Sequence, residues 1–250
     1  MTEQVVIELR DGYAVVTMNK PKRRNALGTE SVRGLLAALS QLAQDDRCRA
    51  VVLTGAAPAF CAGSDLKELG GLSIPDMCAH EEETAAMARR IAHLPVPVIA
   101  AVEGFALGGG FILATSCDVV ITARDAKWAL PEVRNGWLPP WGLQSLLARV
   151  GPVKAQQITW GFLDMDGVEA HRLGVADGLA ENGKTLDMAC DWAARIADLP
   201  PEAVRSTKRY CAATIAADAE RQDAEASRLF AADCQGAAAK ATLAKFTVTA

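Results

Sequence analysis

The chain has 250 residues, half of them hydrophobic and only 5% aromatic, and its formal net charge is −4. This length fits one large α/β domain or two small ones, with enough apolar residues for a substantial core. The acidic balance argues against nucleic acid as the main partner. No apolar stretch reaches the length of a membrane span, because the nearest candidate, VPVIAAVEGFAL, is interrupted by Pro97, Glu103 and Gly104.

Targeting and metal-binding patterns are also missing from the sequence. The N-terminal MTEQVVIELR lacks the basic and then apolar pattern of a secretion signal, and the tail TVTA does not match a peroxisomal address. We therefore expect a cytoplasmic protein. The seven cysteines include no Cys-x-x-Cys pair, which is typical of free cysteines in a reducing compartment. Because His80, His93 and His171 have no metal-ligand spacing, we expect no metal site.

The first half of the chain alternates strand-like and helix-like patterns. Alternating apolar residues around Asp11-Gly12 predict a hairpin, and Thr29 and Asp76 are expected to cap amphipathic helices. The expected elements are the hairpin 5–19, a basic loop 20–28, a helix 29–45, a strand 50–54, a loop 67–76, a helix 76–93, a strand 98–102, a helix 111–117, a strand 118–123 and a short strand ending at Pro131-Glu132.

From Gly142 onward the pattern is almost entirely helical. Glycines or prolines separate the expected helices, which are 142–151, 152–161, 167–174, 185–199, 204–217 and 220–246. Strands that alternate with helices favour right-handed crossovers and a largely parallel sheet. A doubly wound dinucleotide fold is the competing interpretation, but no G-x-G-x-x-G opens a helix after the first strand, and no phosphate-binding loop motif is present.

Two glycine-bearing segments are the most informative part of the chain: AFCAGSDL (59–66) and VEGFALGGGF (102–111). Each follows an apolar strand-like run. Gly109 lies where a glycine turn passes into an apolar helix, and the first N–H groups of a helix have no partner within it and lie at its positive end. One such N–H and a second from the Gly63-Ser64 turn would be two donors aimed at one oxygen, which is an oxyanion hole.

Glu132 is the expected catalytic acid or base. It follows Pro131 at the end of an apolar run, so it should emerge at a buried sheet edge, where desolvation raises the pKa of a carboxyl group. Asp65 suits a turn, because its carboxylate can accept bonds from neighbouring N–H groups. Ser64 is not interpreted as a nucleophile, since Gly-Ser-Asp is not a nucleophile elbow and no histidine stands in a recognisable relation to it.

These segments, together with PKRRNALG (21–28) and the stretch from WALPEV to ARVG (128–151), resemble the crotonase, or enoyl-CoA hydratase/isomerase, family along nearly the whole chain. The resemblance implies a spiral of ββα units as an acyl-CoA-binding core in 1–195, and a helical trimerisation region in 196–250. It implies a coenzyme A thioester as substrate, with no other cofactor, and a homotrimer or dimer of trimers. No nucleic-acid or membrane partner is expected.

The resemblance also implies the roles of individual residues. The N–H groups of Ser64 and Gly109 would hold the thioester oxygen, and Glu132 matches one of the two glutamates of hydratases. Basic residues of the first loop would meet the phosphates of CoA, whose adenine and pantetheine would follow the main chain of 62–66. The expected ligand-binding residues are Lys22, Arg23, Arg24, Ala26, Ala62, Gly63, Asp65, Leu66, Gly108, Pro131 and Gly136.

The chain departs from the hydratase pattern at two positions. Ile112 stands where the other glutamate is expected, with only apolar neighbours, and Pro140 stands where a backbone N–H would help to hold water. Proton transfer by a single glutamate, as in an enoyl-CoA isomerase, is therefore favoured over hydration. The alternatives are a hydratase or dehydratase, other enolate chemistry such as decarboxylation or C–C bond formation or cleavage, and a non-catalytic acyl-CoA-binding protein. Residues 68–87 are expected to wall the acyl pocket.

Overall fold

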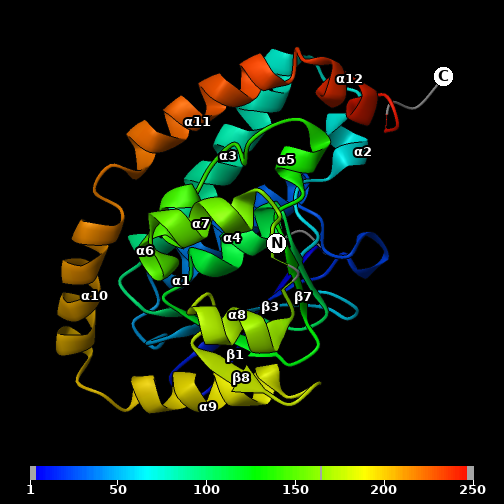
Figure 1. The fold of residues 1–250 in the computed structure, drawn as a ribbon. Coiled ribbons are helices and arrows are strands. Elements are labelled where there is room, and N and C mark those ends of the chain that lie inside the picture. Colours follow the sequence, from blue (N-terminus) through cyan, green and yellow to red (C-terminus); the bar gives the residue numbers. More distant parts are fainter. Residues whose placement is uncertain (1–3, 164, 247–250) are drawn as a thin grey trace.

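The computed structural model describes residues 4–163 and 165–246 (Figure 1). The C-terminal segment TVTA lies outside these residues. The strands are β1 (Val5–Leu9), β2 (Ala14–Met18), β3 (Val51–Gly55), β4 (Val98–Val102), β5 (Phe105–Leu107), β6 (Val119–Ala123), β7 (Lys127–Ala129) and β8 (Gly178–Ala180). A 3-10 turn covers Pro21–Arg23. The helices are α1 (Thr29–Leu42), α2 (Leu66–Leu69), α3 (Ile74–Ala92), α4 (Gly109–Thr115), α5 (Glu132–Asn135), α6 (Leu143–Val150), α7 (Pro152–Thr159), α8 (Gly167–Leu173), α9 (Thr185–Ala197), α10 (Pro201–Ile215), α11 (Ala219–Asp233) and α12 (Ala237–Leu243).

The main sheet has the strand order β1-β2-β3-β4-β6-β8. The β1–β2 hairpin is antiparallel and every other neighbour in this sheet is parallel, as the alternating pattern predicts. Both faces of the central strands β3, β4 and β6 are covered, which explains why these strands are largely apolar runs. Residues such as Val52 and Ile99 pack against α9, whereas Leu53 and Ala100 belong to the larger core with α1 and α3.

A second, two-stranded parallel sheet pairs β5 with β7. Its strands β5 and β7 follow β4 and β6 along the chain and lead to the turns that bear the predicted site. Neither β5 nor β8 is expected from the sequence pattern. Both have only three residues, which is too short to show a period.

The C-terminal helices wrap around the outside of the core (Figure 1). From α9 beneath the sheet, the chain passes through α10 and α11 to α12, which contacts α5, while α11 packs on α3. Residue 195 lies inside α9, which ends at Ala197. Within the described residues, no helix has both the length and the apolar character needed to cross a membrane.

Several predicted boundaries are wrong for identifiable reasons. Ser73, and not Asp76, caps α3, because Ser73 Oγ accepts the Asp76 N–H at 3.3 Å. Helix α1 begins at Thr29 with Gly28 as its cap. The expected loop 67–76 overlaps α2, which is capped by the Asp65 side chain. The expected helix 220–246 is interrupted at Gly236 between α11 and α12.

Candidate active site

Three extended segments run in parallel and end at the same place. Cys61 forms a parallel bridge with Ala106 of β5, and β5 pairs with β7 in parallel register. Because the carboxyl ends of parallel strands meet at one edge, the residues that follow the three segments are brought together. These residues are Ser64, Gly109 and Glu132. The pairing of the three segments therefore brings the predicted site residues together, one after the end of each segment.

The two predicted oxyanion donors lie on turns in close contact. Gly63 has a φ of +85°, and a Cβ on it would lie 2.7 Å from the Leu107 oxygen and 3.1 Å from the Gly109 nitrogen. A Cβ on Gly109 would lie 3.6 Å from the Ser64 nitrogen. Among the described residues, the backbone N–H groups of Ser64 and Gly109 have no hydrogen-bond acceptor. Two unoccupied donors therefore lie side by side at the start of α4.

Gly108 allows the Glu132 carboxyl group to approach these turns. Its φ is +54°, a conformation that favours glycine, and a Cβ on it would lie only 2.7 Å from Glu132 Oε1. The Gly108 N–H donates to the Ala129 oxygen at 2.9 Å, which ties this turn to the end of β7. Any larger residue at position 108 would compete with the carboxyl group for the same space.

Glu132 is buried, with 7% of its surface exposed, and its Oε2 has no hydrogen-bond partner among the described residues. Burial raises the pKa of Glu132 to about 8, a backbone hydrogen bond opposes this rise, and the charge of Glu81 adds to it. An orphaned buried carboxyl oxygen is costly for folding alone. It is suited to exchanging a proton with a ligand near neutral pH.

The site residues surround a cavity of about 70 Å³, here called the reaction cavity. Eight residues predicted from the sequence line it: Ala62, Gly63, Ser64, Leu66, Gly108, Gly109, Pro131 and Glu132. Leu69 and Met77 from the expected acyl wall also line it, whereas Leu72 is 39% exposed and Met87 lies in the main core. The C-terminal helices contribute Phe230 and Leu243.

Glu81, a second carboxyl group, also lines the reaction cavity, so the expectation of a single acid there is wrong. It comes from α3 and is only 3% exposed. The Ser64 hydroxyl donates to one of its oxygens at 2.7 Å and Trp141 Nε1 donates to the other at 2.7 Å. Burial raises the pKa of Glu81, against the opposing effect of Ser64, His80 and Trp141.

A signal for Glu81 exists in the sequence, although it is weak. Glu81 lies four residues after Met77 and four before Ala85, and all three are buried on one face of α3. That spacing is the helical period of a core-facing position. Two further glutamates follow directly in HEEET, and Glu82 and Glu83 are exposed, so only the packing of the helix distinguishes them.

The part of the site around Ile112 and Pro140, where the chain departs from the hydratase pattern, is apolar and offers few free N–H donors. Ile112 and Pro140 both line the reaction cavity. Two residues after Pro140, the N–H of Gly142 donates to the buried Asp223 at 2.7 Å, so this N–H is not free to hold water. The fully buried Trp141 fills the remaining space, with Cζ2 3.2 Å from the position of a Cβ on Gly109.

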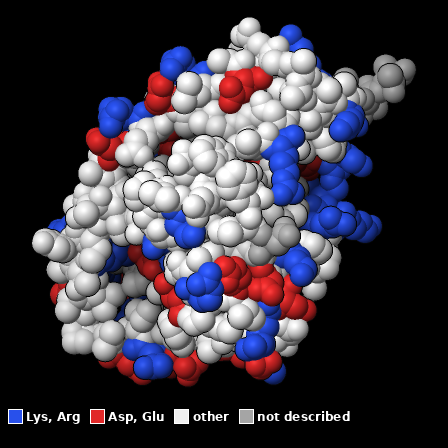
Figure 2. All heavy atoms as spheres, in the orientation of Figure 1, with Lys and Arg blue, Asp and Glu red and all other residues white. Residues whose placement is uncertain are grey.

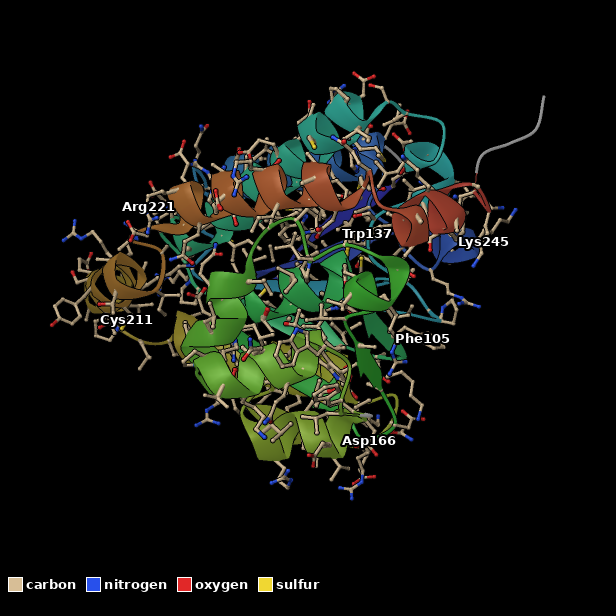
Figure 3. All side chains as sticks on the ribbon, turned by 45° about the horizontal axis from the view of Figure 1, so that its top comes forward. Phe105, Trp137, Asp166, Cys211, Arg221 and Lys245 are labelled. Atoms are coloured by element: carbon tan, nitrogen blue, oxygen red, sulfur yellow. The ribbon has the colours of Figure 1, made fainter. Side chains whose placement is uncertain are left out.

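On the far side of the turn, Trp137 meets Phe230 edge to face at a centroid distance of 6.1 Å. Figure 3 shows Trp137 beside the C-terminal helices, drawn in orange and red. Gly136 lies outside the reaction cavity, because it packs against α12, where a Cβ would lie 2.5 Å from the Ala239 nitrogen. Ala26 is buried beside the basic loop and also lies outside the cavity.

The basic loop lies next to the first glycine turn. The buried Asp65 forms ion pairs with Lys20, at 3.2 Å, and with Arg23. Burial alone would raise the pKa of Asp65, but these two cations hold it below its ordinary value. Lys22 is exposed, and the Arg24 guanidinium lies 5.3 Å from the centre of the Phe105 ring. Figure 2 shows Lys and Arg gathered at the edge of the molecule where this loop lies.

Comparison with known proteins gives a consistent result. The sequence profile of the enoyl-CoA hydratase/isomerase family matches residues 8–248. The chain is 34% identical over 207 residues to a probable enoyl-CoA hydratase of Mycobacterium bovis, covering 82% of this chain and 80% of that protein. It is 34% identical to the short-chain-enoyl-CoA hydratase of Clostridium acetobutylicum, covering 82% and 79%.

A solved enoyl-CoA hydratase/isomerase from Mycobacterium paratuberculosis superposes with a TM-score of 0.90 at 26% identity, over 98% of this chain and 99% of that one. The fold, the paired glycine turns and these matches lead to one conclusion. The chain belongs to the enoyl-CoA hydratase/isomerase, or crotonase, family.

Proposed function

We propose that this protein is an enoyl-CoA isomerase that moves a proton with Glu132 while the N–H groups of Ser64 and Gly109 hold the thioester oxygen. The observation that supports this most directly is the buried Glu132 carboxyl group, which lies against the Gly108 turn and whose Oε2 has no partner in the part of the chain that the structure describes. A carboxyl group with a pKa of about 8 can both accept and return a proton near neutral pH.

In the proposed reaction, the Glu132 carboxylate takes a proton from C2 of a 3-enoyl-CoA. The electrons of that C–H bond form an enolate, whose oxygen accepts hydrogen bonds from Ser64 and Gly109. Glu132 then returns the proton to C4, the double bond moves from C3–C4 to C2–C3, and no atom is gained or lost. Losing one oxyanion donor typically costs about 3–4 kcal/mol of transition-state stabilisation.

The surroundings of Glu132 favour proton transfer over the addition of water. Ile112 is apolar, Pro140 has no N–H, and the N–H of Gly142 is already bonded to Asp223. A water molecule beside Glu132 would therefore find few of the two to four polar partners that a buried water needs. A dry cavity protects the enolate from side reactions.

Hydration of a 2-enoyl-CoA is the second candidate. The relatives from Mycobacterium bovis and Clostridium acetobutylicum are both named hydratases. Glu81 also supplies a second carboxyl group on the reaction cavity, although both of its oxygens already accept hydrogen bonds. That bonding favours a positioning role, in which Glu81 holds the Ser64 turn in place.

For the CoA part of the substrate, we propose the main chain of residues 62–66 and the basic loop as the binding surface. Lys22 and Arg24 are better candidates for the phosphates than Arg23, since Arg23 is paired with Asp65. No cofactor beyond the CoA of the substrate is needed for this chemistry. A homotrimer or dimer of trimers stays a prediction from the family resemblance.

The proposal is tested by incubating the protein with 3-enoyl-CoA and 2-enoyl-CoA in heavy water and following product mass. Isomerisation adds no water and leaves the carbon skeleton intact, with deuterium entering only by exchange. We expect 3-enoyl-CoA to be converted, and Glu132→Gln to abolish conversion while CoA binding persists. A main product heavier by one water would instead identify a hydratase.

A further inference from the structure

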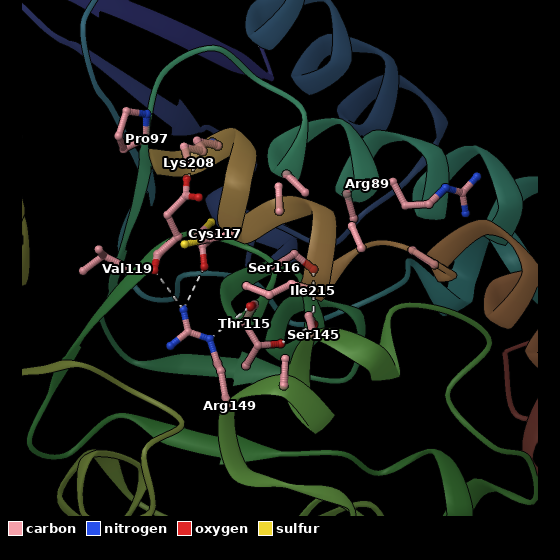
Figure 4. A pocket seen from close by; sticks show the side chains of 18 of the residues that line it. Arg89, Pro97, Thr115, Ser116, Cys117, Val119, Ser145, Arg149, Lys208 and Ile215 are labelled. Carbon is pink, nitrogen blue, oxygen red and sulfur yellow. Dashed lines mark hydrogen bonds and ion pairs between the residues drawn. The ribbon is translucent and has the colours of Figure 1, made fainter. Parts of the chain in front are cut away.

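A second and much larger cavity lies directly behind the reaction cavity. Its volume is about 690 Å³, against about 70 Å³, which is within the range of cavities that hold a whole organic ligand. It lies between α10 and the core, as Figure 4 shows, and its lining includes Ala85, Ala88, Ala148 and Ala212. It is called the alanine-lined cavity below.

The two cavities follow one another along the same two helices. On α3, Met77 and Glu81 line the reaction cavity, and Ala85 and Ala88 continue the same face into the alanine-lined cavity. Helix α4 shows the same succession, since Gly109 and Ile112 line the first cavity, and Thr115 at the end of α4 lines the second together with the next two residues. Trp141 lines both cavities.

Trp141 is held firmly at this boundary. Its side chain is fully buried, and its Nε1 donates to Glu81 Oε2 at 2.7 Å. The following residue, Gly142, is bonded to Asp223 and lies so close to Ile112 that a Cβ on it would meet the Ile112 side chain at 2.2 Å. The indole ring therefore cannot leave its place without breaking these contacts.

The alanine-lined cavity has the chemistry of a hydrocarbon site. The three basic side chains in its lining are each paired, Arg89 with Asp223 at 2.5 Å, Arg149 with Asp177 at 2.9 Å and Lys208 with Asp118 at 2.7 Å. Arg149 also donates to the Cys117 oxygen, as the dashed lines in Figure 4 show. No unpaired cation in the described lining is left for an anionic group, and most of the wall is apolar.

We propose that Trp141 is a specificity-determining residue that separates the two cavities and restricts this enzyme to short acyl groups. This inference rests on the proposed acyl-CoA function. The acyl group enters at Ser64 and Gly109, passes Glu132 and ends against the indole ring. Without that ring the same path would continue between α3 and α4 into the alanine-lined cavity.

The test compares binding of butanoyl-CoA and dodecanoyl-CoA by calorimetry. Both are saturated, so the measurement does not depend on which reaction the enzyme performs. We expect the wild type to prefer butanoyl-CoA. Trp141→Ala should tighten dodecanoyl-CoA binding at least about tenfold relative to butanoyl-CoA, because eight further methylene groups gain an apolar site.

One further variant keeps the test decisive if Trp141→Ala folds poorly. Trp141→Leu opens the boundary with a smaller loss of packing and should show the same change in preference. In the Trp141→Ala background, Ala88→Phe fills the alanine-lined cavity and should remove the gain for dodecanoyl-CoA. Alone, Ala88→Phe should leave butanoyl-CoA binding unchanged. Trp160→Ala, on an exposed side chain, is the control.

Equal binding of both thioesters by the wild type would overturn the separating role of Trp141. The same conclusion would follow if folded Trp141→Ala and Trp141→Leu both showed no change in preference. Failure of the wild type to bind either thioester or free CoA would overturn the acyl-CoA function itself. The two failures are therefore distinguishable.

Discussion

Glu132 and Glu81 are two buried carboxyl groups on one cavity, but their partners differ. Glu81 accepts a hydrogen bond on each oxygen, whereas Glu132 Oε2 has no partner among the described residues. The two hydrogen bonds act to lower the pKa of Glu81, but burial outweighs them and keeps that pKa raised, so their main effect is to hold the Glu81 carboxyl group in one orientation. Pairs of acids in unequal environments often divide roles in this way. Glu132 is then the group that exchanges protons.

The first prediction concerns the pH dependence of isomerisation. In the proposed reaction the base form of Glu132 takes the C2 proton, and burial raises the pKa of Glu132 to about 8. We therefore expect kcat/KM for 3-enoyl-CoA to rise about tenfold per pH unit below pH 8 and to level off above it. A profile that falls as pH rises through 8 would make the protonated carboxyl the active form, as expected if Glu132 donates a proton in hydration.

The second prediction tests the approach of Glu132 to the Gly108 turn. Gly108→Ala adds a Cβ 2.7 Å from Glu132 Oε1 at a φ of +54°, so the carboxyl group must move. We expect kcat to fall by about 100-fold, the loss typical of a misplaced catalytic group. Steady-state kinetics measure this fall in kcat. Gly71→Ala is the matched control, because the nearest atom to its added Cβ is 4.0 Å away, and it should leave kcat unchanged.

At the scale of elements, the site depends on segments that are distant in sequence but paired in space. The Cys61 segment, β5 and β7 bring the two donors and Glu132 to one edge, and α3 adds Glu81. Helix α11 holds the Trp141-Gly142 turn from outside through Asp223, which accepts hydrogen bonds from the Gly142 N–H and from Arg89. This residue therefore links α11 to the wall of the reaction cavity.

The third prediction is that Asp223→Ala destabilises the protein by about 1–3 kcal/mol, because it leaves the Gly142 N–H without its acceptor and Arg89 with only the exposed Glu82 as a partner. In a chain of this size each kcal/mol lowers Tm by about 2–4 °C, which thermal denaturation measures. Glu225→Ala on the same helix removes only the exposed pair with Arg228 and should cost less than about 1 kcal/mol. Similar Tm values for the two variants would contradict the role of Asp223.

At the scale of the whole molecule, a buried cation, Lys208, attaches α10 to the core. Lys208 Nζ donates to the Ile91 oxygen at 2.9 Å, to the Val96 oxygen at 2.8 Å and to Asp118 at 2.7 Å. These groups lie at the end of α3, before β4 and before β6. Many other α10 residues that face the core line the alanine-lined cavity. The hydrogen bonds of Lys208 therefore contribute much of what holds α10 against the core.

The fourth prediction is that Lys208→Met loosens α10. The variant keeps most of the side-chain volume but loses all three hydrogen bonds, so we expect a loss of about 3–5 kcal/mol in the free energy of unfolding. Chemical denaturation measures it, and hydrogen exchange should show faster exchange in 201–215. Arg209→Ala, on the exposed neighbouring residue, should change stability by less than about 0.5 kcal/mol. Unchanged exchange in α10 of the Lys208 variant would contradict this role.

Much of the fold could be predicted from local patterns. Apolar runs identified the central strands β3, β4 and β6, since a strand buried on both faces is largely apolar. Glycines marked the turns at 63 and 109, and the family resemblance is confirmed by the profile match. Short elements such as β5, β8 and α2 escaped prediction because three or four residues cannot show a period.

By itself, the sequence determined the main strands of the first half and their largely parallel pairing, the glycine turns at 63 and 109, and the place of Glu132 after a short strand, because these follow from local spacing. Only the tertiary structure decided which residues surround the site of Glu132. Glu81 meets Ser64 across 17 residues and Trp141 across 60, and Asp223 meets Gly142 across 81. Contacts of that range depend on how whole helices pack, which no local period of apolar residues encodes.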